Sequence, residues 1–237
     1  CHNIDDGCLA YHSVQQPKNG GFSMKSINTF ANHAPKIDWV NDFFRNGKTF
    51  LSEHQLGPMQ ISMFRRFLGD AGLIQKKDTT DLYNLICNIG HTTEDAWGIL
   101  LINLVCSNPQ ICWYVKNLPC GQAFDVENAV NMIMETSLSR DNARSVVYAF
   151  ERICSIQLGK VLRFGTFVKK GRTLTNITRT KPVLPSERVF LYGLYRFAEA
   201  CGGYYEFNLS RLLDCNIESD GVSPAEIFAM TREEVEP

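Results

Sequence analysis

The first twelve residues carry the side chains best suited to metal chemistry. Cys1, His2, Cys8 and His12 lie in a stretch with little hydrophobic periodicity, and a turn-rich Gln-Pro-Lys-Asn-Gly-Gly follows. Cysteine and histidine are ligands of zinc, and cysteine thiolates hold iron–sulfur clusters. We therefore expect Cys1 and Cys8 to hold part of a zinc or iron–sulfur site. Their spacing closes no four-ligand pattern, so further ligands would come from upstream chain or a loop such as that of Cys120; two incidental thiols are the alternative.

A second set of side chains is suited to nucleic acid. Polar and basic residues gather on the outward faces of two predicted helices and at a predicted hairpin turn. Such residues contact phosphates and form hydrogen bonds with base edges. The candidate contacts are Gln60, Ser62, Arg65 and Arg66 in the first helix, Arg140 and Arg144 in the second, and Lys169, Lys170 and Arg172 in the hairpin.

Residues 56–74 position the first of these groups. Pro58 suits the first turn of a helix, and Gly72 lies where a left-handed C-cap would end it. Phe64, Phe67, Leu68 and Ala71 recur at helical spacing between them. An apolar back, a basic front and a glycine stop are typical of the second helix of a helix-turn-helix. An ordinary amphipathic helix with a solvated face is the alternative.

The segments on either side of this stretch complete a first helical unit. Ile37, Val40, Phe43 and Phe44 mark one face of a core helix that ends at Asn46-Gly47. After residue 74, the charged residues 75–78 predict a tight turn, and Thr80-Asp81 predicts the cap of another helix. Residues 94–107 are almost wholly apolar, so we expect a helix buried on all sides. Trp97 and Trp113 are expected in the core.

Residues 125–153 repeat the helix-turn-helix pattern. Asp125 predicts the cap of one helix, and Ser139 or Asp141 begins a second. The second helix would turn apolar residues inward, while Arg140 and Arg144 point outward. Its inward residues are Ala143, Val146, Val147, Phe150 and Ile153. Two such units in one chain favour the nucleic-acid interpretation more strongly than either unit would alone.

A basic hairpin is predicted directly after this second unit. Residues 159–168 are rich in β-forming types, residues 169–172 form a turn around Gly171, and residues 173–180 alternate as a strand does. From Lys160 to Arg188 there are eight Lys or Arg and one Glu. A basic hairpin in this position is a wing, which in winged-helix proteins follows the phosphate backbone. A solvated hairpin with lysines at its tip is the alternative.

The C-terminal part is predicted to pack rather than to bind. Residues 187–201 predict a strong helix and residues 207–213 a short one. Ser223 and Pro224 begin a docking helix over residues 221–235. From Glu206 to the end there are eight Asp or Glu against Arg211 and Arg232, so this region is no anion-binding surface.

Composition limits the remaining possibilities. The chain has 237 residues, 44% hydrophobic residues and a formal net charge of -1, which predicts a globular core and no overall attraction to nucleic acid. No long apolar run or signal peptide is found, so we expect a soluble, cytoplasmic protein without a membrane partner. An odd number of cysteines argues against a disulfide scaffold. The expected core thiols are Cys87, Cys106, Cys112, Cys154 and Cys201. The first residue is Cys1, so we expect a piece of a longer protein.

The predicted fold class is mainly α, with winged-helix-like helical units, a short β-hairpin wing and no doubly wound sheet. We expect an N-terminal Cys/His segment over residues 1–30 and a first helical unit over 31–120. A second helix-turn-helix unit with its basic hairpin would cover 121–182, and a C-terminal packing segment 183–237. No Gly-x-Gly-x-x-Gly or Gly-x4-Gly-Lys-Ser/Thr loop occurs.

Several short stretches resemble a known family. Residues 7–9, 36–40, 56–74, 184–198 and 222–228, the last reading Val-Ser-Pro-Ala-Glu-Ile-Phe, are similar to the C-terminal region of phosphoadenosine-phosphosulfate-reductase-like proteins. They also resemble the related domain that accompanies those proteins in bacterial DNA phosphorothioation and phage-defence clusters. The resemblance implies that sulfur chemistry resides on a separate nucleotide-binding domain, upstream or in a partner. It also implies an iron–sulfur site, to which only Cys1 and Cys8 correspond.

Three hypotheses follow. The first is a non-catalytic domain that binds duplex DNA, or a partner on DNA, for a sulfur-modification or defence system. The second is the accessory half of a sulfur-transferring reductase, with Cys1 and Cys8 holding part of an iron–sulfur or zinc site. The third is an assembly domain that docks through its C-terminal helices.

Overall fold

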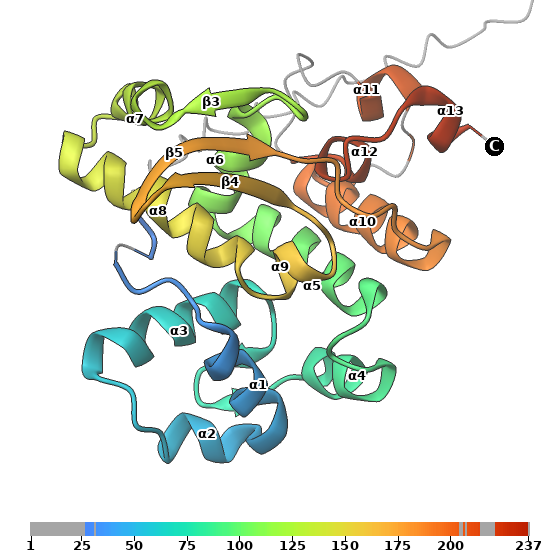
Figure 1. Ribbon diagram of the computed structural model, residues 1–237. Helices are drawn as coiled ribbons and strands as arrows, with labels where there is room; N and C mark the ends of the chain where they lie inside the picture. The colour runs from blue at the N-terminus through green and yellow to red at the C-terminus, as the bar shows by residue number, and fades with distance from the viewer. Residues whose placement is uncertain (1–26, 31, 204–205, 207, 214–220, 237) are drawn as a thin grey trace, which may run out of the picture.

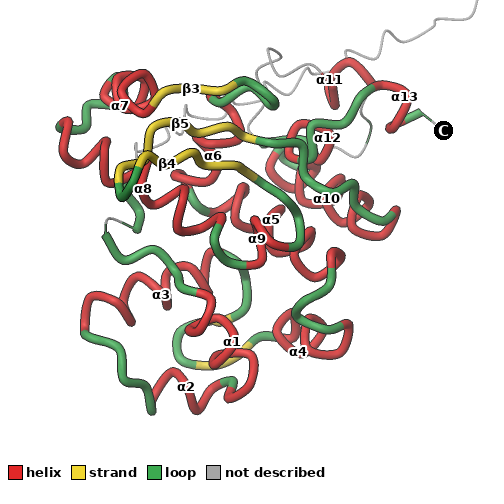
Figure 2. The backbone as a smooth tube through the Cα atoms, viewed as in Figure 1, coloured by secondary structure: helices red, strands yellow, loops and turns green. Residues whose placement is uncertain are grey.

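The computed structural model describes residues 27–30, 32–203, 206, 208–213 and 221–236 (Figure 1). Within these ranges the chain is mainly helical, as the sequence predicts, with two small antiparallel sheets (Figure 2). Cys1 and Cys8 lie outside the described residues, so the predicted metal site stays a prediction.

The first unit consists of three helices and a short hairpin. Its helices are α1 (Ile37–Asn46), α2 (Lys48–Ser52) and α3 (Pro58–Asp70), and its strands are β1 (Ile74–Gln75) and β2 (Asp78–Thr79). Gly47 separates α1 from α2 with a positive φ of 54°, and a Cβ there would lie 2.8 Å from the Tyr83 hydroxyl. The predicted helix end at Gly47 and the predicted tight turn before Asp78 are both confirmed.

A central pair of helices joins this unit to the rest of the molecule. After α4 (Asp81–Ile89), capped by Thr80 as predicted, come α5 (Glu94–Ser107) and α6 (Pro109–Asn117). Trp97 and Trp113 are buried, as expected. Among the described residues, no helix has the length and apolar composition to cross a membrane by itself; α5 and α6 pass that test only as a pair bent by 98°.

The second unit builds a three-stranded sheet against two helices. Its elements are β3 (Ala123–Asp125), α7 (Val126–Met134), α8 (Arg140–Cys154), α9 (Gln157–Lys160), β4 (Gly165–Lys170) and β5 (Thr173–Arg179). The strand order is β3-β5-β4, with both pairings antiparallel. The predicted caps at Asp125 and Ser139 are confirmed by hydrogen bonds from the amides of Asn128 and Asn142. The sequence thus places α7 and α8 correctly.

The start of the predicted hairpin is wrong. Residues 157–160 form α9, and β4 begins only at Gly165 rather than at residue 159. Gly159 explains the difference, because an ideal Cβ at this position would lie 1.7 Å from the Cys154 carbonyl oxygen. The missing side chain allows α9 to fold back against the end of α8.

The described C-terminal part contains four helices, of which the first and the third pack on α5. They are α10 (Glu187–Ala200), α11 (Leu209–Leu213), α12 (Pro224–Ile227) and α13 (Arg232–Val235). The single docking helix predicted over 221–235 is wrong, because the chain breaks between α12 and α13 and Ala229 takes a positive φ of 49°. Ser223 still caps α12 as predicted, through the amide of Glu226.

Buried polar side chains fix the first unit to the central helices. Asn103, 2% exposed among the apolar residues of α5, donates to the Ala71 carbonyl over 3.1 Å. Its Oδ1 accepts from the Tyr192 hydroxyl at 2.6 Å and from Arg196 at 3.1 Å. A buried amide must be hydrogen-bonded to be tolerated, so these contacts define one arrangement of α3, α5 and α10.

Candidate nucleic-acid interface

The predicted basic hairpin is present and lies beside α8 (Figure 1). In its register Phe167 pairs with Ile177 and Lys170 with Thr173, and a bulge interrupts the ladder between Val168 and Lys169. Gly171 forms the turn with a positive φ of 62°. Ile177 is fully buried against the helices, which anchors the strands while their basic end stays outside.

One ion pair fastens this hairpin to α8. The Lys169 ammonium lies 2.6 Å from a carboxylate oxygen of Glu151, which is on α8. Lys170 and Arg172 are exposed, and within the described ranges no carboxylate lies at ion-pair distance from either. The tip therefore presents two positive charges to solvent, next to one that is already neutralised.

Arg140 and Arg144 share a single carboxylate. Both guanidinium groups contact Glu127 on α7, the one of Arg144 at 2.5 Å. Hydrogen bonding from Arg144, together with the charge of Arg140, lowers the pKa of Glu127. All three side chains are about half exposed, and exposed ion pairs of this kind are weak. The group carries one net positive charge and its arginines are free to exchange Glu127 for a phosphate.

The polar face of α3 is partly engaged in local contacts. The Gln60 side chain accepts from the Gly57 amide at 3.0 Å and so caps its own helix. Arg65 donates to the Leu51 carbonyl at 2.6 Å, and the Arg66 guanidinium lies 3.8 Å from Asp70. Ser62 is exposed. Of the candidates on α3, Ser62 and Arg66 are the least constrained.

The structure thus divides the predicted residues between two places. The residues of α8 and the hairpin belong to one unit, connected through Glu127 and Glu151, whereas the residues of α3 belong to the other. Three further residues are partly exposed on α8 and were not predicted as contacts: Ser145, Tyr148 and Arg152. Helical spacing from Arg144 is the signal that could have found the last two, because Tyr148 lies four residues on and Arg152 four residues beyond that.

A segment of the chain before α1 borders the other side of α8. Asn28 donates to the Asn142 side chain at 3.3 Å, and Arg152 donates to the Asn32 carbonyl at 2.6 Å. The buried Gln110 side chain accepts from the amides of Thr29 and Phe30 and holds this segment in place. The exposed strip of α8 is therefore bounded by Asn28 and Asn32 on one side and by β4 on the other.

No protein-family model, no curated protein and no solved structure matches this chain. The resemblance to phosphoadenosine-phosphosulfate-reductase-like proteins therefore stays a prediction.

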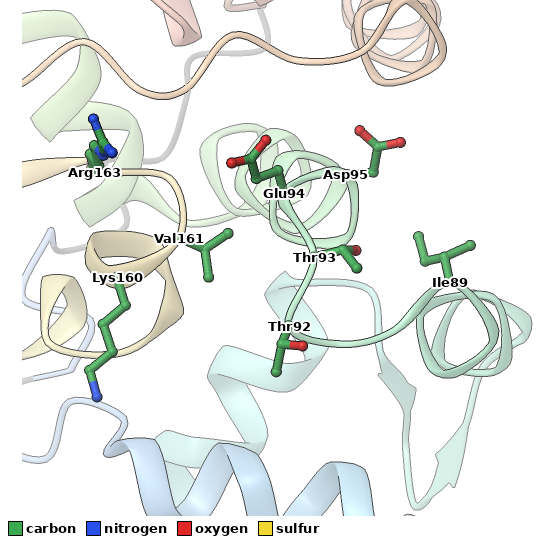
Figure 3. A pocket seen from close by; sticks show the side chains of 8 residues that line it. All are labelled: Ile89, Thr92, Thr93, Glu94, Asp95, Lys160, Val161 and Arg163. Carbon is green, nitrogen blue, oxygen red and sulfur yellow. The ribbon is translucent and has the colours of Figure 1, made fainter.

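An open pocket of about 630 Å³ lies elsewhere, where α9 approaches the start of α5. Its polar lining includes Thr92, Glu94, Asp95, Lys160 and Arg163. Figure 3 shows the Lys160 side chain pointing away from Glu94 and Asp95, and no ion pair joins these groups within the described ranges. Their charges do not converge on one point, so the lining lacks the focused polar groups of a catalytic centre.

The described part of the chain contains six thiols. All six described cysteines are free, and no group of three or more metal-ligating side chains occurs in these ranges. Burial raises the pKa of the Cys112 and Cys154 thiols, which keeps them protonated and poor nucleophiles. The prediction of core positions is wrong for Cys87 and Cys106, which are exposed.

Proposed function

We propose that this chain binds duplex DNA through a winged-helix unit formed by α6, β3, α7, α8, β4 and β5. The order of its elements supports the proposal: a helix, a strand and two helices are followed, after the one-turn helix α9, by a hairpin. The short first strand pairs with the last, which gives the sheet order β3-β5-β4. In this interpretation α7 and α8 are the helix-turn-helix, and the β4–β5 hairpin is the wing.

The observation that carries the proposal is the position of the basic hairpin. It lies against α8 through the Lys169–Glu151 ion pair, with Lys170 and Arg172 exposed at its tip. A helix that enters the major groove would bring an adjacent hairpin to the phosphate backbone. The hairpin supplies phosphate contacts, and α8 supplies the contacts to base edges.

Charge supports the same surface. Residues 123–179 contain nine Lys or Arg against five Asp or Glu, although the whole chain has a formal net charge of -1. Arg179 is buried and binds backbone carbonyls, so it adds nothing to the surface contacts. The positive charge is local, as expected for a protein that binds the phosphate backbone without being basic overall.

The exposed strip of α8 then has defined roles. Arg140 and Arg144 would leave Glu127 for phosphates or guanine edges, to which arginine binds in bidentate fashion. Ser145 and Tyr148 lie farther along the same helix and would contact bases or sugars. The α3 helix, followed by the β1–β2 hairpin, repeats this order on a smaller scale, so Ser62 and Arg66 form a second, weaker contact.

A gel-shift titration with duplex DNA at low salt tests the proposal. We expect the wild-type chain to bind and the Lys169→Ala/Lys170→Ala/Arg172→Ala triple variant to bind at least tenfold more weakly. The matched control replaces Arg45, Lys181 and Arg232 with alanine. These three residues form exposed ion pairs away from α8. The control removes the same total charge and is expected to bind like wild type.

Two results would refute the proposal. One is an absence of duplex binding by the folded wild-type chain at low salt. The other is an equal loss in the hairpin and control variants, because that result would make binding a matter of total charge rather than of this surface.

A further inference from the structure

The outer face of α10 carries an exposed apolar stripe. Figure 1 shows this helix at the edge of the molecule, where its inner face packs on α5 and α12. Val189, Gly193 and Phe197 are buried on that inner side. Leu191 is 66% exposed and Tyr195 52% exposed on the opposite side. Leu191 is more exposed than the other large hydrophobic side chains in the described ranges.

Two opposite charges flank the stripe. Arg188, Leu191, Tyr195 and Glu199 follow one another at spacings of three or four residues and so lie on one face of the helix. Arg188 and Glu199 are both exposed. With a rise of about 1.5 Å per residue, the two charges lie about 16 Å apart along the axis, with Leu191 and Tyr195 between them.

These charges oppose the dipole of their own helix. Arg188 lies in the first turn of α10, where the partial positive charge of the helix disfavours a cation, and Glu199 lies in the last turn, where an anion is disfavoured. Glu199 is partly compensated by Arg196, whose guanidinium lies 3.3 Å away. Apart from its neighbour Glu187, no acidic residue of α10 compensates the positive charge of Arg188. The arrangement suits a partner that offers the reverse order of charges.

The required partner is an antiparallel copy of the same helix. We propose that the Arg188–Glu199 face of α10 is a dimerisation surface for a second copy of this chain. An antiparallel α10 reads Glu, Tyr, Leu, Arg in the opposite direction. A two-fold axis near Gly193 therefore brings Arg188 of each copy within reach of Glu199 of the other. Leu191 of each copy then packs on Tyr195 of the other.

The small size of this surface predicts the strength of the dimer. Two Arg–Glu pairs with an apolar centre on one helix form a small isologous interface, which is characteristic of a weak dimer. The dimer depends on neither α8 nor the hairpin, so its test is independent of DNA binding.

Charge reversal provides the experiment. Sedimentation velocity of the chain across micromolar to millimolar concentrations measures its mass. We expect the wild type to rise from 26.8 kDa towards twice that value. Arg188→Glu and Glu199→Arg each place like charges opposite one another and shift the association at least tenfold to higher concentration. The control Arg232→Glu, on α13, leaves it unchanged.

Mixing the two charge-reversed variants is the decisive test of the antiparallel arrangement. In the mixed pair, the carboxylate introduced by Arg188→Glu in one copy faces the guanidinium introduced by Glu199→Arg in the other. The unchanged Arg188 of the second copy faces the unchanged Glu199 of the first. Association should therefore return, as it should in the Arg188→Glu/Glu199→Arg double variant. Circular dichroism confirms that each variant is folded.

Three outcomes would overturn the dimer. A wild type that stays at 26.8 kDa throughout the range excludes self-association. A wild-type dimer that is indifferent to both reversals uses another surface. Reversals that weaken the dimer without recovery on mixing exclude the antiparallel arrangement.

Discussion

The Lys169 ammonium lies 2.6 Å from the Glu151 carboxylate, so an acidic residue of α8 holds one cation of the neighbouring hairpin. In the proposed complex, Glu151 competes with phosphate for Lys169. The same relationship holds nearer the start of α8, where Glu127 of α7 holds Arg140 and Arg144. Both carboxylates thus reduce the positive charge available to DNA.

Removal of the Glu151 charge should strengthen DNA binding. Glu151→Gln frees Lys169 and removes a negative charge from the proposed interface, so we expect severalfold tighter binding at low salt. The stability of the fold should change by less than about 1 kcal/mol, because the pair is partly exposed. Fluorescence anisotropy and urea denaturation measure the two effects. Weaker DNA binding by a folded Glu151→Gln variant would mean that the tethered hairpin, rather than the free cation, is required.

Glu127→Gln should also strengthen binding, and its effect should depend on pH. The pKa of Glu127 is lowered by hydrogen bonding from Arg144, so the carboxylate remains charged to a lower pH than in the unfolded chain. Its stabilising contribution is therefore complete above the unfolded pKa and is lost as the pH falls through the lower, folded pKa. Wild type and Glu127→Gln should differ in DNA affinity at pH 7, and the difference should shrink as the pH is lowered towards the pKa of Glu127. An equal affinity at pH 7 would contradict the release of Arg140 and Arg144.

Asn103 should be essential for stability. Asn103→Ala removes the partner of the Ala71 carbonyl, the Tyr192 hydroxyl and Arg196. Each buried polar group that is left without a hydrogen bond should lower the free energy of unfolding by about 1–3 kcal/mol. The control Asn131→Ala, at an exposed position on α7, should change it by less than about 0.5 kcal/mol. Equal urea midpoints for the two variants would show that the buried network is dispensable.

Two glycines should respond oppositely to alanine. Gly159→Ala forces a Cβ against the Cys154 carbonyl and should destabilise the fold by more than about 2 kcal/mol, as steric conflict in a packed region does. At Gly69, near the end of α3, a Cβ meets nothing within 4 Å. Gly69→Ala should stabilise the fold by up to about 1 kcal/mol through helix propensity. Thermal unfolding compares them; a stable Gly159→Ala variant would contradict the tight approach of α9 to α8.

Local signals made much of the fold predictable. The caps at Thr80, Asp125, Ser139 and Ser223 depend on a few neighbouring residues, and all four are observed. The same holds for α10, whose apolar spacing is strong over several turns. Hairpin strand β5 was found because its alternation is long enough to recognise.

Contacts between distant segments were not predictable in this way. Strand β3 has three residues, too few to show alternation, and it exists because β5 pairs with it some fifty residues later. Arg179 lies within the basic stretch from Lys160 to Arg188, yet it turns inward to the carbonyls of Val115 and Glu226. Nor does the sequence show that Glu127 and Glu151 lie beside the predicted basic residues, because that depends on how α7, α8 and β4 pack.

The salt dependence of DNA binding tests the proposed winged-helix interface most directly. The logarithm of the binding constant should fall linearly with the logarithm of salt concentration, with a slope of about -0.9 for each phosphate contacted. We predict that the Lys169→Ala/Lys170→Ala/Arg172→Ala variant has a slope shallower by about one for each lost phosphate contact, while the Arg45/Lys181/Arg232 alanine control keeps the wild-type slope. Identical slopes for wild type and the hairpin variant would contradict the account.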